Sequence, residues 1–192
     1  MSLFSLAVSN FKRSGREFSM LVLSLAVSVF IFFNFQNVIY SRAMDVLLEF
    51  RKDLIDSVIQ AASIVFVVFL FFFIWYATNV FLNQRKKEIG IYIFMGLDNR
   101  RISRMYALES AMVGLFALLS GLLLGLLFSK LFQMLLLKLS EISVDVEFSF
   151  SLPPVLNTAG MFVIIYGLMI LKGCWTLKNS SVPVSYTHLP AH

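Results

Sequence analysis

Residues 57–84 read SVIQAASIVFVVFLFFFIWYATNVFLNQ, a stretch that contains no charged side chain. The hydrocarbon core of a bilayer is about 30 Å thick, and an α-helix of about 20 apolar residues crosses it. The backbone of a span must bond to itself, because the core holds no water to satisfy free N–H and C=O groups. This stretch therefore predicts a transmembrane helix.

Three other parts of the chain have the same character. Charge-free stretches run over residues 18–41, 110–129 and 148–171, and 59% of the chain is apolar while only 14% is charged. The first stretch is longer than the apolar core of a signal peptide and has no clear cleavage site, so we interpret it as a retained span. We predict an all-α integral membrane protein with four spans, at about 18–41, 57–83, 106–130 and 153–172.

The basic residues indicate how these spans are oriented. Residues 1–17, 85–109 and the segment after the fourth span hold eleven of the sixteen Lys and Arg residues, and in the two alternate segments acids outnumber bases. Cytoplasmic segments carry the excess of Lys and Arg, so we expect both termini in the cytoplasm and a bacterial inner-membrane location. The basic residues do not gather on one soluble face, so no nucleic-acid partner is expected.

Several kinds of chemistry lack the residues they need. The chain has one cysteine, Cys174, and its two histidines are His188 and His192, so a metal or redox site is not expected in the spans. It contains no G-x-x-x-x-G-K-[ST] phosphate loop and no G-x-S-x-G motif. We therefore predict a protein that is not an enzyme and has no cofactor.

The third span carries small residues at helical spacing. Gly114, Gly121 and Gly125 are among them, and the last two form a G-x-x-x-G pair. Small residues let two helices approach closely in a membrane. The pattern fits packing within this chain as well as contact with a partner.

The segment between the second and third spans has its own helical pattern. Ile89, Ile93 and Gly96 share one side of a short helix, which we expect to lie parallel to the membrane. Gly96 is placed to end that helix, and Asp98 and Asn99 to cap the next one. A solvated loop and an interfacial helix on anionic lipid remain alternatives.

The same segment resembles a known family. The run RKKEIGIYIFMGLDNRRI at 85–102, followed by LES at 108–110, resembles the FtsX-like permease domain of ABC transporters. The residues that match the family pattern are Arg85, Glu88, Ile89, Gly90, Gly96, Arg101, Ile102 and Glu109. The short first outer loop and the four-span layout make the chain similar to the amino-terminal part of bacitracin-export (BceB-like) permeases, over residues 1 to about 178. The FtsX-like transmembrane domain would take up residues 18–178.

This resemblance implies roles for individual residues. In such permeases a short coupling helix docks in a groove of a separate cytoplasmic ATPase. Glu88 and Ile102 would belong to that coupling segment, together with Ile89, Ile93 and Phe94 as apolar anchors, Gly90 and Gly96 for close approach, and Arg100 and Arg101 to pair with acids of the partner. Glu109 would form an ion pair with Arg104 or Arg101.

The resemblance also has a departure. Permeases of this type are several times longer, with ten spans and a large outer domain, so we interpret the sequence as a fragment whose partners include the remaining part of the permease. The ending VSYTHLPAH at 184–192 differs in composition from what precedes it and is similar to translated adaptor sequence. We expect residues 179–192 to be a non-native, disordered tail.

Three functional hypotheses follow from the sequence. The favoured one is a permease subunit in resistance to antimicrobial peptides such as bacitracin, with an ABC ATPase, membrane lipid and a sensor histidine kinase as partners. The second keeps the fold but assigns an FtsX-type transmitter that activates a cell-wall hydrolase, or a lipoprotein-releasing permease. The third, from another class, is a small membrane scaffold without an ATPase.

Overall fold

The computed structural model describes residues 15–40, 42–139 and 152–179, and these residues form four α-helices with no strand among them. The helices are α2 (Gly15–Ile39), α3 (Arg42–Phe94), α4 (Asn99–Leu139) and α5 (Leu152–Asn179). Each contains a segment long and apolar enough to cross a membrane. The predicted all-α fold with four spans is confirmed, whereas the predictions for residues 1–14 and 180–192 lie outside the described residues.

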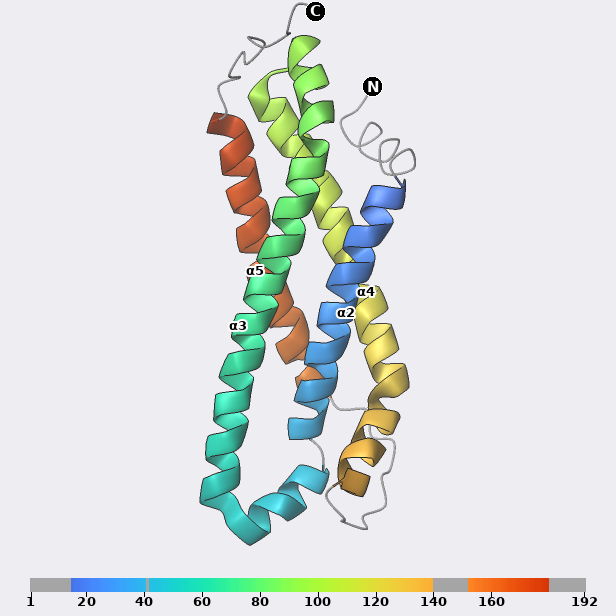
Figure 1. Cartoon of the computed structure of the whole chain (residues 1–192), viewed down its shortest axis with the longest axis vertical. Helices are drawn as coiled ribbons and strands as arrows, with labels where there is room; N and C mark the ends of the chain where they lie inside the picture. Colours follow the sequence, from blue (N-terminus) through green and yellow to red (C-terminus); the bar gives the residue numbers. More distant parts are fainter. Residues whose placement is uncertain (1–14, 41, 140–151, 180–192) are drawn as a thin grey trace, which may run out of the picture.

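Helix α2 contains the most buried of the four spans. It contacts all three other helices, and its contact with α4 is the most extensive in the described chain. Consecutive helices α3 and α4 contact each other least, because they separate below the turn that joins them. The start of α2, the α3–α4 turn and the end of α5 lie at one end of the molecule, the top in Figure 1, which we call the turn end.

Helix α3 is much longer than the span within it. Its 53 residues include residues 42–56 before the second span and the segment predicted to form a coupling helix after it. The predicted coupling segment is helical, and it continues the second span as the last part of α3. The reason is local, since residues 84–94 contain no proline and the first residue that ends the helix is Gly96.

The glycines of α4 bring it close to its neighbours within the chain. A Cβ on Gly121 would lie 2.7 Å from the carbonyl oxygen of Ala26 in α2, and Gly125 faces the ring of Phe33. Gly114 faces the ring of Tyr166 in α5, whose hydroxyl donates a 2.9 Å hydrogen bond to the carbonyl of Ser110. The structure therefore uses these glycines for packing inside this chain.

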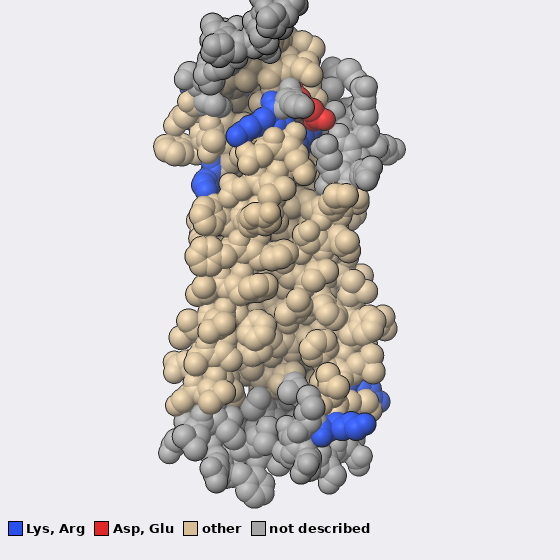
Figure 2. All heavy atoms as spheres, viewed as in Figure 1, with Lys and Arg blue, Asp and Glu red and all other residues tan. Residues whose placement is uncertain are grey.

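Charge is confined to the ends of the described molecule on the face shown in Figure 2. Lys and Arg lie toward both ends, acid is visible only toward the upper end, and an uncharged belt lies between the ends. Such a belt is what a protein surface in contact with lipid requires.

Candidate functional site

The turn between α3 and α4 is closed by a Schellman motif. Gly96 has a φ of 81°, its N–H bonds the carbonyl of Ile93 at 2.9 Å, and the N–H of Leu97 bonds the carbonyl of Tyr92 at 3.1 Å. The carbonyl of Asp98 then accepts the first hydrogen bonds of α4. The turn is thus a short, defined reversal of the chain, at the residue where the sequence predicts it.

Large apolar side chains are exposed at this turn. Ile91, Phe94 and Met95 have 58%, 73% and 62% of their surface exposed. Arg100 and Arg101, at the start of α4, are also exposed. We call these five residues the turn surface.

A buried ion pair lies below the turn surface. The guanidinium of Arg85 in α3 is paired through Nη1 with the carboxylate of Glu109 in α4, and the two side chains are 3% and 1% exposed. The same guanidinium donates to Glu88 Oε2, from Nη2 at 2.7 Å and from Nε at 3.1 Å. Glu88 is 38% exposed, so this group reaches from the interior to the surface. We call Arg85, Glu88 and Glu109 the Arg85 cluster.

Aromatic rings shield the Arg85 cluster from the membrane side. The guanidinium lies 5.1 Å from the centroid of the Phe18 ring in α2 and 5.8 Å from that of Phe81 in α3. The two rings lie 5.3 Å apart. Cation–π contacts of this kind gain strength where water is excluded.

The cluster therefore connects three helices at the turn end. Separating a buried, hydrogen-bonded ion pair leaves an uncompensated charge, which costs about 3–5 kcal/mol. Because α3 and α4 contact each other so little elsewhere, this pair and the turn hold them in register. Phe18 adds α2 to the same unit.

Comparison with known protein families places these features in context. The sequence profile described as FtsX-like permease C-terminal matches residues 61–181, a range that contains both the turn surface and the Arg85 cluster. The chain belongs to the FtsX-like permease family.

The individual relatives are named as permeases, and some of them as permeases of ABC transporters. The chain is 30% identical over 182 residues to the bacitracin export permease protein BceB of Halalkalibacterium halodurans and 29% identical to that of Bacillus subtilis. An uncharacterized ABC transporter permease of Bacillus subtilis, YvcS, is 32% identical over 175 residues. The matches cover 90–95% of this chain but only 27–28% of the relatives, so the chain spans less than a third of their length.

Within this FtsX-like permease the predicted site residues fall into two groups. Phe94, Arg100 and Arg101 are exposed on the turn surface, and Gly90 and Ile93 are half-buried beside it. Ile89 and Ile102 instead point inward, where they line the small space around the Arg85 cluster. At the end of a span, one face of a helix packs against the bundle and the opposite face is exposed to solvent. Helical periodicity shows which residues share a face, but it does not show whether that face is the packed or the exposed one.

One predicted contact is corrected. The sequence pairs Glu109 with Arg104 or Arg101, whereas the structure pairs it with Arg85. Arg104 and Glu109 are five residues apart, which separates them by about 140° around a helix of 3.6 residues per turn. Arg104 is exposed on one side of α4 while Glu109 is buried on another.

Sequence reasoning missed two members of the turn surface and the role of Arg85. Ile91 and Met95 flank Phe94 on the exposed side, and their apolar character directly before the helix-ending Gly96 was the available signal. Among the described residues, no group of three His, Cys, Asp or Glu side chains is placed to hold a metal ion.

Proposed function

We propose that this chain is membrane-embedded permease sequence of a bacitracin-export type ABC transporter, and that its turn surface docks in a separate cytoplasmic ATPase. On this proposal the turn end faces the cytoplasm of a bacterial cell, as does each terminus. The system acts in resistance to peptide antibiotics that target the cell wall, with a sensor histidine kinase as a further partner.

The observation that carries the proposal is the exposed apolar tip of α3. Ile91, Phe94 and Met95 lie several residues beyond Arg85 and Lys86, where the apolar part of the second span ends. Apolar side chains that are exposed outside the hydrocarbon, with arginines beside them, are typical of protein interfaces. Phe94 provides the large anchor, and Arg100 and Arg101 provide charge for acidic groups of the ATPase.

The geometry supports a transmission mechanism. Helix α3 is continuous from the tip into the membrane, so a displacement of Phe94 moves the second span without an intervening hinge. The Arg85 cluster passes that displacement to α4, and Phe18 passes it to α2. ATP-driven closure of the ATPase would then move several spans together, as rigid bodies.

The subfamily assignment rests on the named relatives. Two of them are called bacitracin export permeases, and they match most of this chain. On this proposal the chain contributes transmembrane helices and the tip of α3 that contacts the ATPase, and the ATPase subunit hydrolyses the nucleotide.

Co-purification with the cognate ATPase tests the proposal. Phe94→Asp places a charge at the centre of the turn surface, and Phe94→Leu, the matched control, keeps an apolar side chain there. We expect Phe94→Asp to weaken binding at least about tenfold, because an interface anchor contributes about 2 kcal/mol or more. Phe94→Leu should retain binding, and undiminished binding by Phe94→Asp would overturn the proposal.

A further inference from the structure

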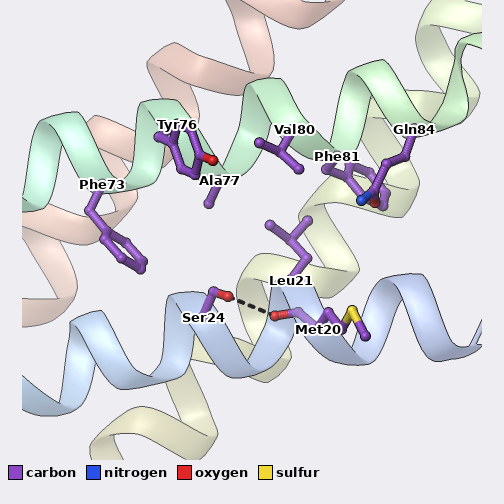
Figure 3. A pocket seen from close by; sticks show the side chains of 9 residues that line it. All are labelled: Met20, Leu21, Ser24, Phe73, Tyr76, Ala77, Val80, Phe81 and Gln84. Atoms are coloured by element: carbon purple, nitrogen blue, oxygen red, sulfur yellow. Dashed lines mark hydrogen bonds between the residues drawn. The ribbon is translucent and has the colours of Figure 1, made fainter.

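A groove runs between α2 and α3 in the half of the membrane nearest the turn end. Figure 3 shows it, with Met20, Leu21 and Ser24 on one wall and Phe73, Ala77, Phe81 and Gln84 among the residues on the other. It encloses about 200 Å³. None of the residues that line it carries a charge.

The lining is apolar for most of its length. The hydroxyl of Ser24 donates a 2.9 Å hydrogen bond to the carbonyl of Met20, so it is already satisfied within α2. The amide of Gln84 lies at the end of the groove nearest the turn, directly before Arg85 and Lys86. The groove therefore changes from apolar to polar where the charged end of the molecule begins.

The length of the groove matches one leaflet of a bilayer. From Phe73 to Gln84 the axis of α3 rises about 16 Å at 1.5 Å per residue. Half of a hydrocarbon core about 30 Å thick is about 15 Å. Met20 and Tyr76 are 56% and 69% exposed, so the groove is open toward the surrounding lipid.

We propose that this groove binds one acyl chain of a phospholipid from the leaflet at the turn end, with its headgroup beside Gln84 and the exposed Lys86. A hydrocarbon tail suits the apolar walls, and the amide suits the ester region of the lipid. A transmembrane helix is excluded as the occupant, because a helix with its side chains is about 10 Å wide and does not fit a space of this volume. The site requires only a bilayer and does not depend on the proposed coupling to an ATPase.

The groove shares a wall with the Arg85 cluster. Phe81 lines the groove and also covers the guanidinium of Arg85, while its ring contacts Phe18. A tail in the groove packs against the same ring that excludes water from the ion pair. Occupation by lipid thus stabilises the arrangement in which α2, α3 and α4 are joined.

Photo-crosslinking tests the site directly. The full chain is placed in phosphatidylglycerol and phosphatidylethanolamine nanodiscs with a trace of phosphatidylglycerol that carries a diazirine in one acyl chain, and crosslinked peptides are mapped by mass spectrometry. Ala77→Phe fills the groove from α3, and Ser24→Leu fills it from α2. Ala111→Phe, on an exposed position of α4, is the matched control.

We expect crosslinks concentrated on residues 73–84 and 20–24. Either groove-filling variant should lower them at least about tenfold, the factor that corresponds to about 1.4 kcal/mol of binding free energy. Ala111→Phe should leave them unchanged. Crosslinks spread evenly over all lipid-facing helices, or an unchanged yield in Ala77→Phe and Ser24→Leu, would each overturn the proposal.

Discussion

The guanidinium of Arg85 on α3 is paired with the carboxylate of Glu109 on α4, and both side chains are almost completely removed from solvent. These helices follow each other in the chain but share few other contacts. The pair therefore fixes the angle at which the tip of α3 meets the rest of the bundle. Its loss should affect both the stability of the fold and the transmission of movement.

Removing one member of the pair should be more harmful than removing both. Arg85→Met removes the cation that is paired with the buried carboxylate of Glu109 and should lower the free energy of unfolding by about 3–5 kcal/mol. Glu109→Met leaves the guanidinium of Arg85 bonded to Glu88 alone and should lower it by less. The double variant Arg85→Met/Glu109→Met should recover most of that loss, since it leaves no buried charge and the remaining carboxylate, Glu88, reaches the surface. Unfolding of the chain in mixed micelles, followed by tryptophan fluorescence, measures the cycle.

The control for that cycle is the exposed Arg104. Arg104→Met removes a charge of the same kind from the same end of α4, and it should change the free energy of unfolding by less than about 0.5 kcal/mol. Equal losses for Arg104→Met and Arg85→Met would show that the buried pair has no special role.

Close packing between α2 and α4 depends on Gly121. The Cβ of an alanine there would lie 2.7 Å from the backbone oxygen of Ala26 and 2.7 Å from the Cβ of Val29, and neither of these atoms can rotate away. Gly121→Ala should therefore force the helices apart and cost about 1–3 kcal/mol in the same unfolding measurement.

Gly160 offers a matched substitution in α5. A Cβ there meets no atom within 4 Å. Gly160→Ala should be neutral or stabilising by up to about 1 kcal/mol, because alanine favours a helix over glycine. If the two alanine variants behaved alike, the close approach at Gly121 would be refuted.

The turn surface depends on the backbone conformation of Gly96. Its φ of 81° lies in the left-handed region, and no atom lies within 4 Å of an added Cβ, so a substitution there meets backbone strain alone. Gly96→Val should cost about 1–2 kcal/mol, whereas Gly96→Asn should cost less, because asparagine tolerates this region. The order of stability Gly, Asn, Val is the expected result, and equal stability of Val and Asn would contradict it.

Much of this fold follows from the order of residues along the chain. Long uncharged runs specify spans because lipid offers the backbone no partner, whatever the neighbouring helices are. The end of α3 at Gly96 was equally predictable, since left-handed backbone strongly favours glycine.

Contacts between helices were not predictable in the same way. The partner of Glu109 depends on which face of α3 turns toward α4, and a single sequence with helical periodicity leaves that rotation open. For the same reason the sequence predicts Ile89 as an external anchor, whereas in the structure it lies beside Arg85. Gly121 and Gly125 signalled a close approach, but only the structure identifies α2 as the neighbour.

The accessibility of position 94 to a water-soluble label is the most direct test of the claim that the turn surface lies in the cytoplasm and binds an ATPase. The test uses two single-cysteine variants in a Cys174→Ala background, Phe94→Cys and Lys138→Cys. Lys138 is an exposed position near the opposite end of α4 and serves as the comparison. Each variant is treated with a membrane-impermeant maleimide in intact cells and in inside-out vesicles. We predict that Phe94→Cys reacts only in inside-out vesicles and becomes protected when the ATPase is bound, while Lys138→Cys reacts in intact cells. Labelling of Phe94→Cys in intact cells would contradict the account.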